Sequence, residues 1–236
     1  MSGPVLDIDG LVKPYQGLRP LRLARLTLHP GEQVALLGFD APAAEMLSTL
    51  ITGALTPEAG VVRLLGTSTT SIQDSEQWLA LVDRIGVVTE RAVLLDPLTV
   101  LQNLALPFTI SIDSLTEEVR GRAQALAGEA GLGAATWDVP VGDLDTAART
   151  RVRLGRALAL DPALLILEHP SAQVERDAVV PLARHIRSVA ERRSLATLTL
   201  TADEAFARAV ASTTLTWRPA DGTLVGPKRG WLPWRG

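Results

Sequence analysis

One stretch constrains the fold of this chain more than any other: an apolar run turns at a single glycine and continues as an amphipathic segment. Residues 34–37 (Val-Ala-Leu-Leu) have the pattern of a buried strand, and Gly38 follows them. The apolar residues after the turn recur at helical spacing, namely at Ala43, Met46, Leu47, Leu50, Ile51 and Ala54. The stretch therefore predicts a strand from Gln33 to Leu37, a tight loop, and a helix that ends near Thr56 and Pro57.

Strands alternate with helices along the rest of the chain, which favours an α/β fold built on a parallel sheet. The further strands are expected at Val5–Gly17, Leu21–Leu28, Val61–Leu65, Ile85–Thr89, Ala163–Leu167, Ser194–Thr201 and Ser212–Trp217. A short helix is expected over Ser75–Val82, and a longer one carries the stripe Val179, Leu182, Ala183, Ile186 and Val189. From Arg91 to about Arg156 the pattern is mainly helical, with Leu115, Val119, Ala123, Leu126 and Ala130 on one face, which predicts a helical lobe.

Length and composition limit the classes of protein that this chain can belong to. With 236 residues, 47% of them apolar, and no internal repeat or flexible linker, residues 1–236 suit one domain with an appended or inserted lobe. The net charge of -3 gives no general attraction to nucleic acid. The absence of cysteine excludes disulfides and thiolate metal sites. Because there is no basic leader and no run of about 18 apolar residues, we expect a cytosolic chain without its own membrane span.

The turn at Gly38 has the spacing of a phosphate-binding loop without its chemistry. In the working motif a second glycine, a lysine and a serine or threonine follow four loop residues, so that amides, ammonium and hydroxyl hold phosphates and magnesium. In this chain the second glycine is replaced by Ala43, the lysine by Ala44 and the serine or threonine by Glu45, and Met46 follows. Pro42 has no amide donor, and each carboxylate of Asp40 and Glu45 would repel a phosphate charge by roughly 4 kcal/mol at about 4 Å. We expect a negative loop that binds no polyphosphate, with Glu45 satisfying the helix start instead.

The order of these elements resembles the nucleotide-binding subunit of ABC transporters over nearly the whole chain. Four stretches are similar to that family: 30–38, 50–66, 94–107 (beginning Leu-Leu-Asp-Pro-Leu-Thr-Val) and 151–167. The last, with Arg-Val-Arg-Leu-Gly-Arg-Ala-Leu followed by Asp-Pro-Ala-Leu-Leu-Ile-Leu, is the most specific. The resemblance implies an α/β, P-loop NTPase-like ABC nucleotide-binding domain with a parallel core sheet, an N-terminal β-rich part and a helical lobe at approximately 91–156.

The resemblance also assigns the family's functional positions to residues of this chain. Tyr15 stands where the family stacks an aromatic ring on adenine, and stacking and ordinary packing both remain open. Glu90 replaces a glutamine that touches magnesium and senses the membrane subunit, and a surface carboxylate is favoured. The Leu-Ser-Gly-Gly-Gln signature, which grips the γ-phosphate bound by the opposite subunit, is replaced by Leu144, Asp145, Thr146, Ala147 and Ala148. We expect Asp145 to cap the helix that follows.

Three further positions complete the comparison with the family. Glu168 and His169 follow the buried strand where the family has its magnesium aspartate and its glutamate base. Glu168 could reach a metal and His169 could act as a base, but a structural role at the strand end is favoured. Ala202 replaces the switch histidine and cannot contact a γ-phosphate.

Two basic groups have open interpretations. The first consists of Arg149, Arg151, Arg153 and Arg156. It could bind an anion or a partner, and a solvated helix face is favoured. The second is the tail 228–235, which pairs tryptophans with basic residues and could dock on a membrane interface or a partner. A tail that lies on its own domain or is partly disordered is favoured, because Gly and Pro interrupt it.

Six altered motifs on an intact scaffold favour a degenerate, non-catalytic ABC-type subunit with no catalytic residue and no expected cofactor or metal. We expect it to dock on an integral membrane permease at the inner face of the cell membrane, as a structural or regulatory component beside a second ABC nucleotide-binding subunit. The main alternative is an active ATPase that uses ATP and magnesium through unconventional residues or a hybrid site with a partner. A second alternative is a soluble scaffold that has left transport.

Overall fold

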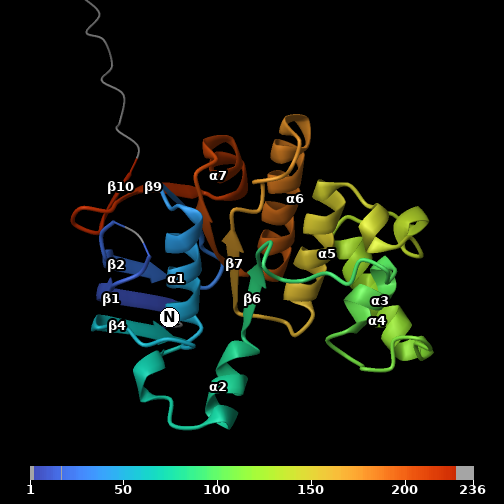
Figure 1. Ribbon diagram of the computed structural model, residues 1–236, viewed down its shortest axis with the longest axis horizontal. Helices are drawn as coiled ribbons and strands as arrows, with labels where there is room; N and C mark the ends of the chain where they lie inside the picture. Colours follow the sequence, from blue (N-terminus) through green and yellow to red (C-terminus); the bar gives the residue numbers. More distant parts are fainter. Residues whose placement is uncertain (1–2, 17, 227–236) are drawn as a thin grey trace, which may run out of the picture.

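A six-stranded sheet lies in the middle of the computed structural model, which describes residues 3–16 and 18–226 (Figure 1). Its strand order is β10-β9-β3-β8-β7-β6. The five parallel strands are β3 (Gln33–Leu37), β6 (Ile85–Val88), β7 (Leu164–Glu168), β8 (Ala196–Thr201) and β9 (Thr213–Arg218). The short β10 (Thr223–Val225) pairs antiparallel with β9. Parallel strands end at one edge of a sheet, so the loops that follow β3, β6 and β7 lie near one another.

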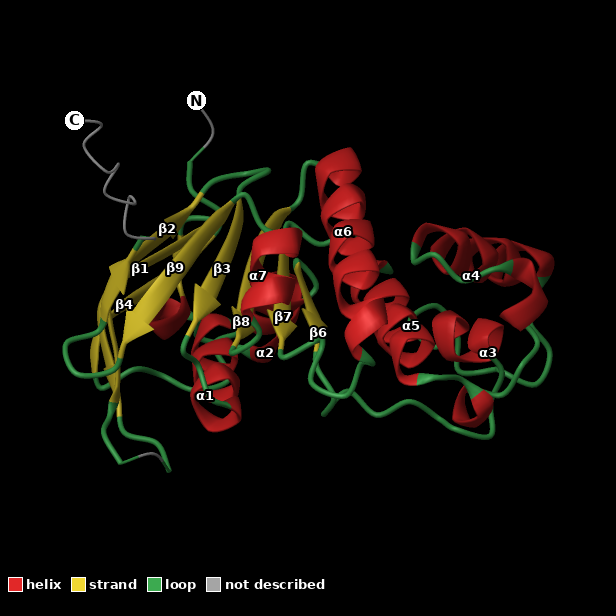
Figure 2. Cartoon of the chain, turned by 90° about the horizontal axis from the view of Figure 1, so that it is seen from above, coloured by secondary structure: helices red, strands yellow, loops and turns green. Residues whose placement is uncertain are grey.

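A smaller antiparallel sheet and the helices cover this central sheet. The antiparallel sheet contains β2 (Leu21–Leu28), β1 (Leu6–Lys13), β4 (Ala59–Leu64) and β5 (Thr67–Ser68), in that order. The helices outside the lobe are α1 (Ala41–Ile51), α2 (Ser75–Val82), α6 (Arg176–Arg193) and α7 (Glu204–Val210). The lobe contains α3 (Val100–Ala105), α4 (Glu117–Glu129) and α5 (Thr146–Leu158). Figure 2 shows the antiparallel sheet at one end of the molecule and the lobe helices at the other.

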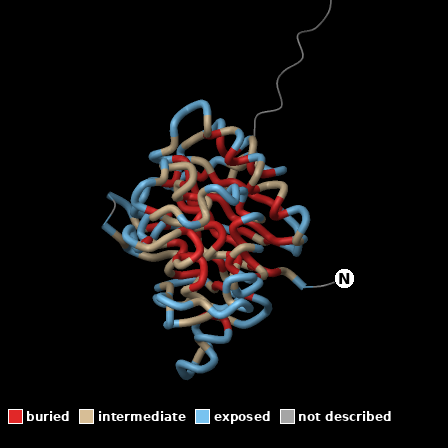
Figure 3. Tube along the Cα trace, turned by 90° about the vertical axis from the view of Figure 1, so that its right-hand side faces the viewer, coloured by how far each residue is buried: buried red, intermediate tan, exposed pale blue. Residues whose placement is uncertain are grey.

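The hydrophobic core consists of two clusters, one on each face of the central sheet, and Figure 3 shows this buried interior. Successive strand residues point to opposite faces, so Val34 and Leu36 join one cluster while Ala35 joins the other. The first cluster contains α1 and the antiparallel sheet. The second runs without interruption from the sheet through α6 into the lobe, where it includes the apolar stripe expected at 115–130. The lobe and the sheet therefore share one core.

The expected fold class and the helical lobe are confirmed, with differences at the ends of elements. The bounds of β2, β3 and α2 agree with the sequence. The first helix ends at Ile51 and not near Thr56, because Thr52 caps it and Gly53 turns the chain with φ +70°. The first strand ends at Lys13 and not at Gly17, because its pairing with β2 ends there. The sequence did not predict α7 or β10. No helix in the described part of the chain has the length and hydrophobicity to cross a bilayer.

Candidate functional site

The loop after β3 is short, and its helix begins earlier than a phosphate-binding loop would allow. Gly38 turns the chain with φ +93°, and α1 already begins at Ala41. Asp40 caps this helix: the amide of Ala43 donates to its Oδ1 at 2.8 Å, and the amide of Ala44 donates to its carbonyl oxygen at 2.9 Å. The prediction that Glu45 satisfies the helix start is therefore wrong, because the nearer carboxylate of Asp40 takes that role.

Side chains fill the inner side of this loop. Ala43 and Ala44 have no exposed surface, and Phe39 between the turn and the cap is buried. The ring of Phe39 stacks on Trp217 of β9 at a centroid distance of 4.3 Å. A Cβ atom on Gly38 would lie 3.2 Å from the carbonyl oxygen of Trp217, so a glycine suits this turn both by its conformation and by its lack of a side chain. The loop is thus packed into the core shared with the antiparallel sheet, which Met46 also contacts.

An arginine connects two of the positions that the family resemblance singles out. The guanidinium of Arg91 donates to both carboxylate oxygens of Glu168, at 2.8 and 2.7 Å, and to Oε1 of Glu45 at 3.0 Å. Glu168, at the end of β7, is only 5% exposed, whereas the side chain of Arg91 is 47% exposed. The negative charge expected of the loop is only partly balanced, because Arg91 pairs with Glu45 and Glu168 and not with Asp40.

The sequence interpretation missed Arg91, although a signal for it exists. Arg91 follows β6 by three residues, Glu168 ends β7, and these two strands are parallel neighbours. A basic and an acidic residue at the same ends of adjacent parallel strands can be expected to meet. Finding the pair from sequence alone requires knowing that β6 neighbours β7, which the chain order does not reveal.

Glu90 and His169 lie beside this ion pair without joining it. Glu90 is exposed, and its Oε2 accepts a hydrogen bond from Nε2 of Gln173 at 3.0 Å. His169 follows β7 in a left-handed conformation with φ +43°, and its amide donates to the carbonyl oxygen of Leu200 at 2.9 Å. Its Nε2 is buried and has no hydrogen-bond partner among the described residues. Neither side chain reaches the carboxylates that Arg91 holds.

Tyr15 and Ala202 occupy the outer parts of the region. Tyr15 is half-buried and packs on the cluster beneath α1. Burial raises the pKa of its hydroxyl, and the nearby Asp40 carboxylate raises it further. Ala202 is exposed, and the adjacent Asp203 caps α7 by accepting from the amide of Phe206 at 3.0 Å. Packing thus accounts for the place of Tyr15, and Ala202 presents only a methyl group.

The segment at the signature position, 144–148, contains the start of α5, and this helix is also capped by an aspartate. Asp145 caps α5, with its Oδ1 accepting from the amide of Ala148 at 2.7 Å, as the sequence predicts. Leu144 packs against the lobe core. Asp145 is exposed, and the remaining residues of the segment, Thr146, Ala147 and Ala148, are half-buried.

The four arginines of α5 are not a solvated face, which corrects the sequence expectation. Each is half-buried and donates to a backbone carbonyl oxygen: Arg149 to Val141, Arg151 to Ala130, Arg153 to Ala92 and Arg156 to Val93, at 3.0, 3.0, 3.3 and 2.7 Å. Burial lowers the pKa of the last three guanidinium groups from their ordinary value. Long side chains with several donors suit this task, since they reach carbonyls in loops that the helix itself does not touch. The tail 228–235, for which the sequence left docking and packing on its own domain open, lies outside the described residues.

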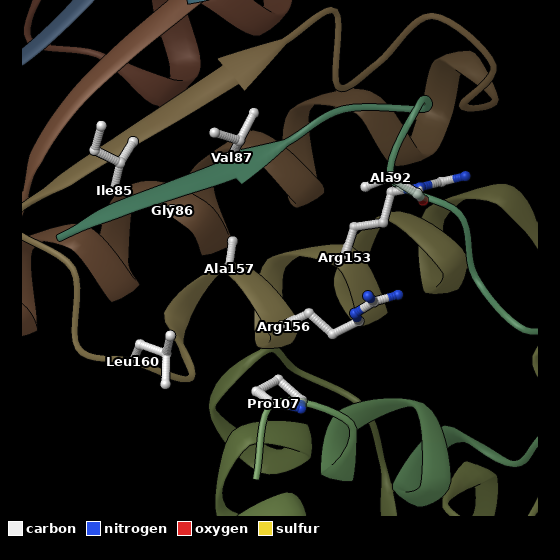
Figure 4. A pocket seen from close by; sticks show the side chains of 9 residues that line it. All are labelled: Ile85, Gly86, Val87, Ala92, Pro107, Arg153, Arg156, Ala157 and Leu160. Carbon is white, nitrogen blue, oxygen red and sulfur yellow. Dashed lines mark hydrogen bonds between the residues drawn. The ribbon is translucent and has the colours of Figure 1, made fainter. Parts of the chain in front are cut away.

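A groove of about 300 Å³ lies where the edge strand β6 packs against α5 (Figure 4). Its lining residues are Ile85, Gly86, Val87, Ala92, Pro107, Arg153, Arg156, Ala157 and Leu160. Leu160, which lines the groove, is 49% exposed, and Val93, the chain neighbour of the lining residue Ala92, is 71% exposed. Through Ala92 the groove adjoins the segment that enters the lobe.

Comparison with known proteins gives one consistent result. Residues 21–172 match the family described as ABC transporter. The lipoprotein-releasing system ATP-binding protein LolD of Pseudomonas syringae pv. tomato is 30% identical over 208 residues, which cover 86% of this chain and 91% of that protein. The structure of cbiO1 from Clostridium perfringens, described as part of the ABC transporter complex cbiONQ, has a TM-score of 0.78 at 18% identity and covers 94% of this chain and 87% of that one. The dimeric ATP-binding cassette MJ0796 bound to ADP and Pi has a TM-score of 0.75 at 22% identity, over 96% of this chain and all of that one.

Proposed function

Because this chain belongs to the ABC transporter family as an ATP-binding subunit, we propose that it is a structural or regulatory subunit of a transport complex that does not hydrolyse ATP. One observation carries the proposal: the guanidinium of Arg91 pairs with Glu45 and Glu168, the residues at two of the three positions from which the family contacts magnesium. We propose that the chain contributes to the complex by binding its partner subunits and not by hydrolysing ATP.

The residues of the site do not fit magnesium and a nucleotide polyphosphate. In P-loop NTPases the loop amides and a lysine cradle the phosphates, while a loop hydroxyl and an aspartate hold the metal. Here the amides of Ala43 and Ala44 are bonded to Asp40, and neither residue is exposed. A phosphate would approach the carboxylates of Asp40 and Glu45 without meeting a loop lysine, and the nearby Arg91 is already paired with Glu45 and Glu168. Repulsion between the phosphate and the Asp40 carboxylate, which this arginine does not neutralise, supports weak or absent binding.

The proposed partner is an integral membrane permease, which the chain would bind from the cytoplasmic side beside a second ABC nucleotide-binding subunit. The relatives support this assignment by their names, a lipoprotein-releasing system for LolD and the complex cbiONQ for cbiO1. We assign the contact to the groove between β6 and α5, because Leu160, which lines it, and Val93, which follows the lining residue Ala92, expose apolar surface. Burying apolar surface favours association by about 25 cal/mol per Å².

Measurement of ATP binding and phosphate release by the purified chain tests the absence of catalysis. At millimolar MgATP we expect no saturable heat of binding and no release above the background without protein. Micromolar affinity with magnesium-dependent turnover would overturn the proposal. The same assay on the native complex, with and without this subunit, tests the hybrid site: turnover that disappears when only this subunit is removed, while the partner ATPase stays bound, supports the alternative.

Recovery of the native complex tests the docking surface. The variant Leu160→Asp should reduce the recovered polytopic membrane protein by about tenfold or more, because it places a charge in an apolar contact. The control is Leu18→Asp, since Leu18 is another exposed leucine but lies in the turn between β1 and β2. Equal recovery with Leu160→Asp and with the unchanged chain would exclude the groove as the contact.

A further inference from the structure

The segment 89–98 joins the sheet to the helical lobe, since it runs from the end of β6 to the start of α3. We propose that Arg91 in this segment is a built-in cation that fixes the lobe on the sheet without any nucleotide. This inference rests on the proposed function, because it assumes that Arg91, and not a bound ligand, lies between the carboxylates of Glu45 and Glu168.

On the sheet side, Arg91 ties the segment to two separate elements. It reaches Glu45 on α1 and Glu168 at the end of β7, at 3.0 and 2.7 Å. The contact with Glu168 uses both carboxylate oxygens, and such charge-assisted bidentate contacts are stronger and more directional than neutral hydrogen bonds. Because Glu168 is almost fully buried, it would lose its only cationic partner among the described residues if Arg91 moved away.

On the lobe side, the same segment is held by its backbone. Arg153 and Arg156 of α5 donate to the carbonyl oxygens of Ala92 and Val93, the two residues that follow Arg91. Further along, Asn103 of α3 has no exposed surface and exchanges hydrogen bonds with both the amide and the carbonyl oxygen of Leu95, each at 3.0 Å. The segment is therefore attached at one end to the sheet through a side chain and at the other to the lobe through its main chain.

These two sets of contacts together give Arg91 a mechanical role. If a cation between Glu45 and Glu168 came with a ligand, the position of the lobe would depend on ligand concentration. A guanidinium that belongs to the connecting segment is always present at the site. The lobe, and the groove beside it that we assign to the permease, should therefore keep one position whether or not nucleotide is added.

Hydrogen exchange of the full-length chain tests this role. In Arg91→Gln, amides of 89–107 should exchange about tenfold faster or more, equivalent to about 1.4 kcal/mol of lost local stability, while the antiparallel sheet keeps its rates. Arg91→Lys, which keeps the charge but not the bidentate geometry, should give a smaller increase. The matched control is Arg63→Gln, since Arg63 forms an exposed pair with Asp7 at 3.2 Å and is far from the segment. Unchanged exchange in Arg91→Gln would overturn the proposal.

Two further measurements keep the test decisive. If Arg91→Gln does not fold, Glu45→Gln removes only the more exposed partner and should still accelerate exchange in 89–107; no change there would count against the proposal. Millimolar MgATP should leave exchange of the unchanged chain as it is, and increased protection of 89–107 on addition would contradict a ligand-independent lobe. If the unchanged chain hydrolyses ATP and Arg91→Gln also shows faster exchange in 89–107, only the proposed function is refuted. If the unchanged chain does not hydrolyse ATP and Arg91→Gln shows no faster exchange, only the role of Arg91 is refuted.

Discussion

The two helix starts that correspond to the family's phosphate contacts, those of α1 and α5, carry the same local device in different surroundings. Each begins at an aspartate whose Oδ1 accepts from the amide three residues later, Asp40 from Ala43 and Asp145 from Ala148. Both capping aspartates are exposed, but at α1 the amides next to the cap belong to the fully buried Ala43 and Ala44, and Phe39 is stacked on β9, whereas at α5 the corresponding Ala148 is only half-buried. A cap alone occupies amide donors, while burial also removes the space that a ligand needs. The start of α1 is thus closed by tertiary packing and that of α5 only by its own sequence.

The largest effect should come from removing the packing that distinguishes α1. Phe39→Ala deletes a buried ring in contact with Trp217, and such truncations cost about 3–5 kcal/mol because a cavity remains. Urea denaturation gives the free energy of unfolding. Leu144→Ala, beside the cap of α5, is the matched control and should cost less because Leu144 is only partly buried. Equal losses for the two variants would break the comparison.

Loss of the α1 cap should have the next largest effect. Asp40→Ala frees the amide of Ala43, which is fully buried and cannot turn to water. We expect a loss of about 1–2 kcal/mol in the free energy of unfolding. Asp40→Asn retains an acceptor at the same place and should recover most of it. Failure of asparagine to recover stability would mean that the charge of Asp40, and not its hydrogen bond, is what matters.

Loss of the α5 cap should cost less. Asp145→Ala exposes an amide at the surface, where water can replace the aspartate, so we expect about 0.5–1 kcal/mol from the same urea measurement. Asp145→Asn again serves as the control that keeps the acceptor. A loss as large as that of Asp40→Ala would show that burial around α1 adds nothing to its cap.

The smallest effect expected is the change of stability with pH that His185 causes. His185 lies on α6, away from both caps, and serves as an internal reference. Burial lowers the pKa of His185 on α6, and the charge of Arg151 lowers it further, although the carbonyl oxygen of Glu129 accepts from its ring at 2.9 Å and opposes the shift. As pH falls below the ordinary pKa of about 6.5, the unfolded chain binds the proton first. The contribution of His185 to stability is therefore complete above that pH and is lost as pH falls toward its lowered folded value.

Urea midpoints between pH 7.5 and 5.5 check this slope. His185→Gln should flatten it, because the titrating group is removed. The Glu129 carboxyl nearby, whose pKa is lowered by its hydrogen bond to Arg193, contributes stability above its own ordinary pKa and loses it only at lower pH. The difference between Asp40→Ala and Asp145→Ala should be the same at both pH values, since neither cap contacts His185. If the stability difference between Asp40→Ala and Asp145→Ala changes with pH, the two caps are not independent of His185.

The amino-acid sequence determined most of the elements and the cap of α5, because these depend on neighbours along the chain. The apolar run of β3, the stripe on 115–130 and the aspartate before α5 are local patterns, and the structure has them where the sequence placed them. The sequence also determined the family, since four stretches retain its order of residues. The early end of α1 was missed because its apolar spacing continues past Gly53, where the backbone turns.

Only the tertiary structure decided which charges meet. Arg91 lies 46 residues from Glu45 and 77 from Glu168 along the chain, and they come together because β3, β6 and β7 end at one edge of a sheet. The same applies to the arginines of α5, whose spacing suggests a solvated face but whose partners are carbonyl oxygens of distant loops. Local patterns record hydrophobicity and backbone preference, whereas electrostatic pairing depends on distance in space, which the fold alone sets.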